Sequence, residues 1–315
     1  MELNQLIEKV LTTQLLQDKP PVLLDIGASG EIHPEWRMIA KHSVCVAFDA
    51  DDRDFNNSET DSGYKKVHLI NAIVSNKEDK TTVFYLTSSP HCSSSLYPLI
   101  DKLESWSFSD LFKVEKTIEL KNVSLASVLK EKNINYMDWF KTDSQGTDLR
   151  LFTSLSDELQ KNAIIAQFEP GIIDAYKGED KFHGVLTYMD KMPYWASEIN
   201  IMGSKRIAKT TLQKYKLDPA TDFNIPNSSC WGEITYFNSF ENKNSDRDIL
   251  LGWVFSTIKQ QHGFALDLLN LKNTIDKNLF SELEKYSLEQ IRPIQVTFTT
   301  KQKIKNKLTH YINKL

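Results

Sequence analysis

Glycines and acidic residues follow several short apolar runs in this sequence of 315 residues. The run VLLDIG at 22–27 ends in a turn that contains Gly27 and Gly30, and VAFDAD at 46–51 places Asp49 at the end of a second run. A glycine turn lets backbone N–H groups approach a ligand, and an acid about twenty residues later can hydrogen-bond both hydroxyls of a ribose. Together they predict a site for an adenosine-containing cofactor.

The glycine turn also indicates which kind of adenosine cofactor to expect. Dinucleotide-binding turns have the pattern G-x-G-x-x-G, whereas DIGASGE at 25–31 has only Gly-x-x-Gly. The missing middle glycine favours a cofactor without phosphates. Asp25 would repel a pyrophosphate, but it can face the cationic end of an aminoacyl sulfonium ligand. A nicotinamide-dependent oxidoreductase is the alternative that this turn disfavours.

Two further acids end later apolar runs and are candidates for catalysis. Asp143 follows the run YMDWFKT, and Glu169 follows AIIAQF. If these runs are neighbouring strands, their carboxylates lie on one rim and could hold Mg²⁺ together with water and substrate hydroxyls. Alternatively, Asp143, or His91 in the polar segment HCSSS, acts as a general base without a metal. The residues alone leave both mechanisms open.

The order of the predicted elements indicates how these residues are brought together. Predicted strands at 22–27, 43–51, 65–75, 80–87, 114–124, 136–143 and 163–170 are interspersed with helices at 3–16, after Pro34, at 124–133 and from about Thr147. Such alternation implies right-handed βαβ units in a doubly wound, mainly parallel sheet with helices on both faces. Segments 196–203 and 231–238 could close the sheet as a late strand pair. Ligands of such sheets bind at the carboxyl ends of the strands.

The pattern changes after residue 240. Ser245 and Asp248 are spaced for a capping box ahead of ILLGWVF, Gly263 could end that helix, and helical runs follow at about 279–291 and 300–315. We therefore divide the chain into an N-terminal helix at 1–20, a cofactor-binding α/β domain at 21–240 and a helical C-terminal extension at 241–315.

Composition and charge indicate the cellular compartment and the classes of substrate to expect. The cysteines Cys45, Cys92 and Cys230 lie far apart, which predicts free thiols in a reducing compartment. No stretch approaches eighteen apolar residues and the N-terminus lacks the features of a signal peptide, so we expect a cytoplasmic protein without a transmembrane segment. A net charge of −4 argues against a nucleic-acid substrate. Oligomeric state is left open.

The motifs also resemble a known family. The series VLLDIGASG, VAFDAD, NAIVSN, HCSSSLYP, LASVLKEKNINYMDWFKTDSQGTDLRLF and IAQFEP is similar in order and spacing to the FkbM-type methyltransferases over about 20–205. The most specific part is the D-x-x-K-x-D-x-Q-G-x-D-L block from Asp138 to Leu149. This resemblance implies a Rossmann-like class I methyltransferase fold, S-adenosyl-L-methionine as methyl donor, and O-methylation of a hydroxyl on a sugar, glycan or secondary metabolite.

Site residues follow from the resemblance position by position. It assigns Asp25, Gly27, Ala28, Ser29 and Gly30 to the cofactor loop, Asp49 and Ala50 to the ribose, Asn71 and Ala72 to the adenine, and Asp143 with Gln145-Gly146 to the methyl group and the acceptor. The family often has Glu-Pro where this chain has Asp49-Ala50, which keeps an acid but shortens it. No motif matches beyond about residue 205, where acceptor specificity would lie. The alternatives are a non-catalytic adenosine-binding protein and a methyltransferase of another acceptor class.

Overall fold

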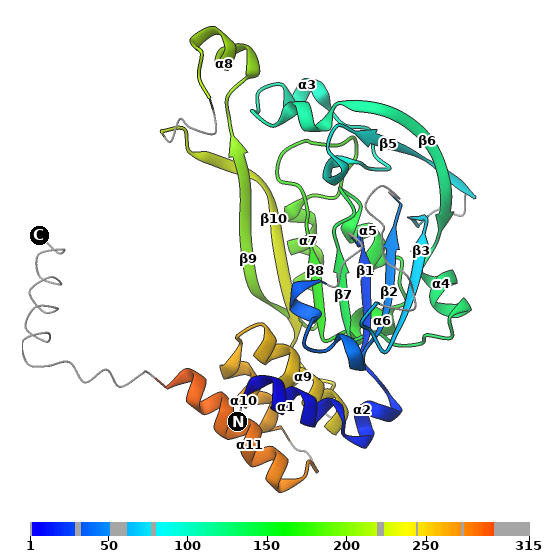
Figure 1. Ribbon diagram of the computed structural model, residues 1–315, viewed down its shortest axis with the longest axis vertical. Helices are drawn as coiled ribbons and strands as arrows, with labels where there is room; N and C mark the ends of the chain where they lie inside the picture. Colours follow the sequence, from blue (N-terminus) through cyan, green and yellow to red (C-terminus); the bar gives the residue numbers. More distant parts are fainter. Residues whose placement is uncertain are drawn as a thin grey trace, which may run out of the picture.

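A mostly parallel sheet forms the centre of the protein (Figure 1). The computed structural model describes residues 2–28, 33–50, 62–76, 80–218, 224–243, 245–271 and 274–292, and within them this sheet has seven strands in the order β3-β2-β1-β7-β8-β10-β9. The parallel strands are β1 (Val22–Ile26), β2 (Val44–Asp49), β3 (Lys66–Asn71), β7 (Trp139–Thr142) and β8 (Ile165–Phe168). The antiparallel pair β9 (Tyr194–Lys205) and β10 (Asn227–Asn238) completes it.

Alternate residues of the strands face two separate cores. On one face, Leu23, Trp139 and Ile165 pack with helices α1 (Leu3–Leu11), α9 (Asp246–Ile258), α10 (His262–Leu269) and α11 (Lys277–Ile291). On the other face, Leu24, Phe140 and Ala166 pack with α4 (Leu125–Glu131), α5 (Asp148–Thr153), α6 (Asp157–Asn162) and α7 (Phe182–Met189). Apolar side chains on both faces are what a covered parallel sheet requires. The prediction of a mixed α/β fold with a mainly parallel sheet is therefore confirmed.

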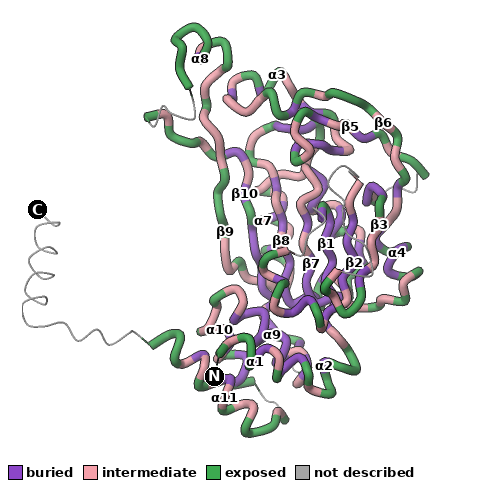
Figure 2. The backbone as a smooth tube through the Cα atoms, in the orientation of Figure 1, coloured by how far each residue is buried: buried purple, intermediate pink, exposed green. Residues whose placement is uncertain are grey.

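A second, three-stranded sheet arches over the carboxyl ends of the central strands (Figure 1). In the described residues it consists of β4 (Ile73–Val74), β6 (Val114–Val123) and β5 (Thr81–Thr87), in that order. The connection from β5 to β6 carries three short helices, η3 (Pro90–Cys92), α3 (Ile100–Leu103) and η4 (Ser109–Phe112). In Figure 2 the strands β1, β2, β7 and β8 are mostly buried, whereas β9 is half-buried or exposed along its length and α8 (Lys209–Tyr215) is largely exposed. This second sheet, which we call the roof, thus stands over the strand ends where ligands were predicted to bind.

Several predicted elements need correction near the amino terminus. The expected helix at 3–16 is two helices, α1 and α2 (Gln14–Asp18). They separate at Thr12 and Thr13, whose hydroxyls donate to carbonyl oxygens of the preceding turn and so compete with continued helix. After the glycine turn, Pro34 opens a 3₁₀ turn, η1 (Pro34–Trp36), and η2 (Ala40–His42) follows, instead of the expected α-helix. Trp36 and Ile39 are fully buried at a spacing of three, which suits 3₁₀ geometry.

Other corrections concern the strand at 65–75 and the C-terminal helices. The predicted strand is divided between the two sheets, as β3 and β4, with Ala72 between them. Gly263 does not end α9; it lies inside α10, and the chain turns instead at Gln260, which has φ of 57°. The run at 300–315 lies outside the described residues.

Within the described residues no helix combines the length and apolar character needed to cross a membrane.

A buried ion pair joins the amino ends of β1 and β7 to the start of α9. Arg247 donates from both terminal nitrogens to Asp138, at 2.8 and 2.7 Å, and from Nε to the carbonyl oxygen of Lys19. Asp138 also accepts the backbone N–H of Val22 at 2.9 Å. A bidentate pair with its remaining groups hydrogen-bonded is the geometry in which a buried charge is tolerated. The pair therefore fixes α9 against the sheet.

Replacing Asp138 by alanine should be strongly destabilising, because it leaves the Arg247 charge buried without its partner. We expect the free energy of unfolding in urea to fall by about 3–5 kcal/mol. Asp157→Ala, which removes the exposed Lys161–Asp157 pair, is the control and should change it by no more than about 0.5 kcal/mol. Equal effects of the two substitutions would show that the buried pair has no special role.

Candidate active site

Gly27 brings the end of β1 against the start of the Asp143 loop. Its φ is 85°, and a Cβ built on it would lie only 2.1 Å from the carbonyl oxygen of Asp143. The N–H groups of Gly27 and Ala28 donate to the carbonyl oxygen of Phe48, at 2.9 and 3.0 Å, so the turn is also hydrogen-bonded to β2. Only glycine combines this backbone conformation with this approach. The ends of β1, β2 and β7 are therefore held side by side.

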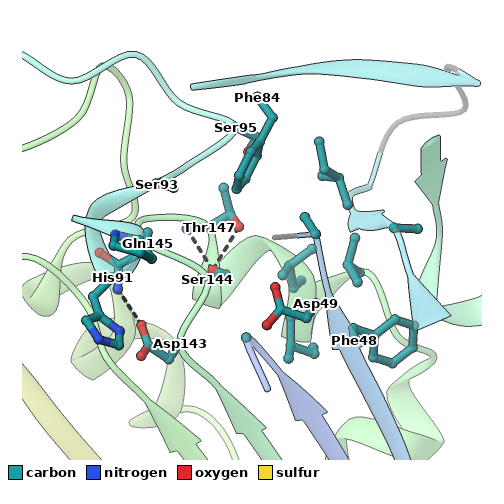
Figure 3. A pocket seen from close by; sticks show the side chains of 18 residues that line it. Phe48, Asp49, Phe84, His91, Ser93, Ser95, Asp143, Ser144, Gln145 and Thr147 are labelled. Atoms are coloured by element: carbon teal, nitrogen blue, oxygen red, sulfur yellow. Dashed lines mark hydrogen bonds between the residues drawn. The ribbon is translucent and has the colours of Figure 1, made fainter. Parts of the chain in front are cut away.

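A pocket opens between these strand ends and the second sheet. Of the residues assigned from the sequence, it is lined by Gly27, Asp49, Ala50, Ala72, His91 and Asp143. Asp49 lies on one side of the pocket, above β2, and Asp143 and His91 lie on the other (Figure 3). Residues from five separate segments of the chain thus meet at one site.

Other pocket residues were missed by the sequence reasoning. The apolar part of the wall is formed by Phe48, Ile73, Val74, Phe84 and Leu151, and the polar part by Ser93, Ser95, Ser144 and Thr147, beside Gln145, which the resemblance had already assigned. Phe84 belongs to the second sheet, and Ser93 and Ser95 to the segment that follows η3. The available signal was the series of serines in HCSSS, next to His91.

Some residues assigned to the cofactor are placed elsewhere. The Asp25 carboxylate is buried and accepts from Lys141 Nζ at 3.1 Å, so it does not line this pocket. Asn71 donates a hydrogen bond from its side-chain amide to the carbonyl oxygen of Asp49 at 3.2 Å, and so joins the ends of β3 and β2. Ala28 is buried in the core, and Ser29 and Gly30 lie outside the described residues.

Lys141 is committed to an ion pair with Asp25. Burial lowers its pKa, but the carboxylates of Asp25 and Asp143 more than offset this, and the pKa lies above its ordinary value. Lys141 therefore stays charged, and its proton is not available for exchange with a substrate. The lysine reduces the repulsion between acids that the strand ends bring together.

Asp143 is oriented by a chain of hydrogen bonds. Gln145 donates its amide to Asp143 Oδ1 at 2.6 Å, and the Tyr176 hydroxyl donates to Gln145 Oε1 at 3.0 Å. The backbone of Gln145 is left-handed, with φ of 54°, and its carbonyl oxygen accepts from the Ser94 hydroxyl at 2.8 Å. This arrangement fixes one carboxylate oxygen of Asp143.

Glu169 shares a proton with Asp143. Burial, followed by the charge of Asp143, raises the pKa of Glu169 to about 9, and the two carboxyl groups are hydrogen-bonded. Two carboxyl groups this close cannot both ionise without a large penalty. Glu169 therefore keeps its proton at neutral pH and donates it in the hydrogen bond to Asp143.

Asp148 holds the loop between Asp143 and α5 in shape. One of its carboxylate oxygens accepts from the Thr142 hydroxyl, the Ser144 N–H and the Ser144 hydroxyl, at 2.8, 3.1 and 3.2 Å. Its side chain is fully buried, and burial raises its pKa to about 7. The spacing of the D-x-Q-G-x-D block thus joins one acid that lines the pocket, Asp143, to one supporting acid.

A row of polar residues crosses four strands of the sheet beside this site. Asp25 is in register with Lys141, Lys141 with Gln167, and Gln167 with Thr235. Gln167 accepts from the Trp139 indole at 2.7 Å and donates to Thr235 at 3.2 Å. Lys141, Gln167 and Thr235 form the floor of a cavity of about 790 Å³, which we call the polar chamber.

The walls of the polar chamber carry further charged groups. Lys259, at the end of α9, pairs with Glu35 and with Glu198, the latter at 3.0 Å. His33 also lines this chamber, and burial lowers its pKa.

A second cavity, of about 590 Å³, lies beneath η3 and η4, and we call it the aromatic chamber. Both chambers include His91, Asp143, Glu169 and Glu233, so they meet at the shared carboxyl pair.

The suggested magnesium site at Asp143 and Glu169 remains a hypothesis. In the part of the chain that the structure describes, no three His, Cys, Asp or Glu side chains are grouped as metal ligands. The hydrogen bond between the two carboxyl groups gives them a partner that needs no metal.

Glu169→Gln should change how stability depends on pH. The pKa of Glu169 in the folded protein lies above its ordinary value of 4.5, so the folded state binds this proton more tightly. Stability from this site is present below about pH 4.5 and is lost as the pH rises toward 9. The glutamine variant should therefore be more stable than the wild type at pH 8.5, relative to the difference at pH 5.5, by urea unfolding. Parallel pH profiles of the two proteins would contradict the assignment.

Comparison with known proteins agrees with this geometry. Residues 40–195 match the family model described as a methyltransferase FkbM domain. The matched segment, about half of the chain, contains Asp49, His91, Asp143 and Glu169. No curated protein and no solved structure matches the chain. The resemblance in the sequence motifs is confirmed, and the chain belongs to the FkbM methyltransferase family.

Proposed function

We propose that this protein transfers a methyl group from S-adenosyl-L-methionine to a hydroxyl of a sugar, glycan or secondary metabolite. The observation that carries the proposal is that the pocket lined by Asp49 and the polar chamber meet at Asp143. A donor in the first and an acceptor in the second would both reach this carboxylate. Alignment of donor and acceptor is the main requirement of methyl transfer.

The residues of the pocket fit the proposed donor. Asp49 offers two carboxylate oxygens for the ribose hydroxyls, and Ile73 and Phe84 offer apolar surface for the adenine. Gly27 leaves space next to Asp143 that a side chain would occupy. When bound, the sulfonium of the donor supplies an electrophilic methyl group whose C–S bonding electrons return to sulfur.

Asp143 is placed to accept the proton of the acceptor hydroxyl. A sugar hydroxyl is a weak nucleophile, so its O–H bond must break as its oxygen takes the methyl group. Gln145 and protonated Glu169 hold the Asp143 carboxylate in one orientation. Polar side chains of the chamber, among them Gln167 and Asn200, can hold the other hydroxyls of the acceptor. His91, beside Asp143, is the second candidate for the base.

We also propose that the protein works in the cytoplasm. The cysteines Cys45, Cys92 and Cys230 are free and buried, as suits a reducing compartment.

The first test is titration calorimetry with S-adenosyl-L-methionine, S-adenosylhomocysteine and NAD⁺. We expect one-site binding of both sulfur ligands and none of NAD⁺. Asp49→Ala should weaken binding of S-adenosylhomocysteine by about 10- to 100-fold, because it removes charge-assisted hydrogen bonds to the ribose. Asp157→Ala, an exposed acid on α6, should bind as the wild type does. Unchanged affinity in the Asp49 variant would refute its role.

The second test separates catalysis from donor binding. Asp143→Asn should lower kcat by about 10²- to 10⁴-fold, the usual contribution of a general base, while donor affinity changes only slightly. Release of S-adenosylhomocysteine from a panel of glycosides measures turnover, with and without EDTA. Loss of donor affinity in Asp143→Asn as large as in Asp49→Ala would contradict the division of roles. Loss of activity with EDTA, restored by Mg²⁺, would favour the metal mechanism instead.

A further inference from the structure

The aromatic chamber contains a row of packed rings. Phe108 and Phe112 have centroids 5.3 Å apart, and Phe112 and Tyr176 are 5.6 Å apart. Ile173, Ala175 and Trp231 line the same cavity. These residues belong to a third apolar cluster, separate from the two cores of the central sheet. An apolar lining that surrounds an open cavity indicates a ligand with an apolar part.

This chamber is continuous with the reacting groups. Asp143, Gln145 and Glu169 form its inner end, and Asp143 and Glu169 also bound the polar chamber. Tyr176 belongs to the row of rings and holds Gln145, which in turn holds Asp143. An acceptor whose hydroxyl lies at Asp143 can therefore extend into both chambers.

The linings of the two chambers favour different chemical groups. The polar chamber offers amide, hydroxyl and charged side chains, as the hydroxyls of a sugar require. In the aromatic chamber the side chains of Phe108, Leu111 and Ile173 have no hydrogen-bonding group, and the Tyr176 hydroxyl is already bonded to Cys92 and Gln145. Sugar hydroxyls placed against these apolar side chains would lose water without gaining partners.

Trp231 places a polar group beside these rings. Its indole nitrogen is buried, and among the described residues it has no hydrogen-bond partner. Buried polar groups are normally paired, so an unpaired donor at a cavity indicates an acceptor atom on a ligand. An aromatic ring with an oxygen substituent would satisfy both the rings and this donor.

We propose that the acceptor is an aryl glycoside, with its sugar in the polar chamber and its aryl group in the aromatic chamber. The proposal rests on the proposed methyl transfer and names its substrate class. The aryl group positions the sugar so that one hydroxyl lies at Asp143. Burial of a ring of this size should lower KM by about 10- to 100-fold.

The test compares matched pairs of glycosides. A panel of 4-nitrophenyl glycosides and the corresponding methyl and octyl glycosides is assayed for S-adenosylhomocysteine release. We expect kcat/KM to be at least tenfold higher for the aryl member of the best pair. Trp231→Ala should abolish this advantage. Leu111→Asp, at a position 46% exposed, should do the same without disturbing a core. Tyr215→Ala, at an exposed ring on α8, is the control.

The outcomes distinguish this inference from the proposed function. Turnover of methyl glycosides without an aryl advantage, or a greater advantage for octyl glycosides, would overturn the inference and leave O-methylation intact. Absence of turnover for every glycoside, with binding of 4-nitrophenyl glycosides that Trp231→Ala abolishes, would retain the chamber and overturn O-methylation of glycosides. Absence of both turnover and binding would overturn both.

Discussion

The contact between Gly27 and the backbone of Asp143 is the constraint on which the site depends. It places the turn after β1 directly against the loop after β7, so the pocket above β1 and β2 ends at the Asp143 carboxylate. Two buried ion pairs hold the segments that lead up to this contact. Lys141 and Asp25 pair just before it, and Arg247 and Asp138 pair at the opposite end of the strands. The D-x-x-K-x-D block thus supplies a structural acid, a charge-compensating lysine and an acid that lines the pocket in six residues.

Several carboxyl groups lie close together at this rim. Those with a raised pKa hold their protons more tightly, which reduces the repulsion between them. Glu169 keeps its proton beside Asp143, and burial, Asp143 and Glu198 raise the pKa of Glu233. Lys141 and Lys259 are the lysines of the polar chamber, and each is already paired with carboxylates. Because both lysines are already paired, the oxygen atoms of the chamber remain to accept protons and hydrogen bonds. This suits the neutral, hydroxylated acceptor that we propose.

The sequence predicted those features that depend on short segments. Buried parallel strands are nearly continuous apolar runs, so their ends, and with them Asp49, Asp143 and Glu169, could be located. The role of Asp25 could not, because its partner Lys141 lies 116 residues away. The chambers were missed for the same reason, since only tertiary packing brings Glu35 to Lys259 in the polar chamber and Phe112 to Trp231 in the aromatic chamber. One signal was present: Asp25, Lys141 and Gln167 are polar residues inside apolar runs, and the sheet aligns them.

The β9–β10 hairpin has a consequence for how this enzyme could diversify. The proposed donor pocket is formed by β1, β2, β7 and the roof, whereas Glu198, Trp231 and Glu233 of the two proposed acceptor chambers lie on the hairpin, outside the matched domain at 40–195. Loop and edge segments tolerate change better than the buried strands beside them. Exchange of hairpins between relatives would then alter which molecules are modified while the methyl-donor machinery is inherited intact. The same division makes the hairpin the natural segment to graft when a new acceptor is sought.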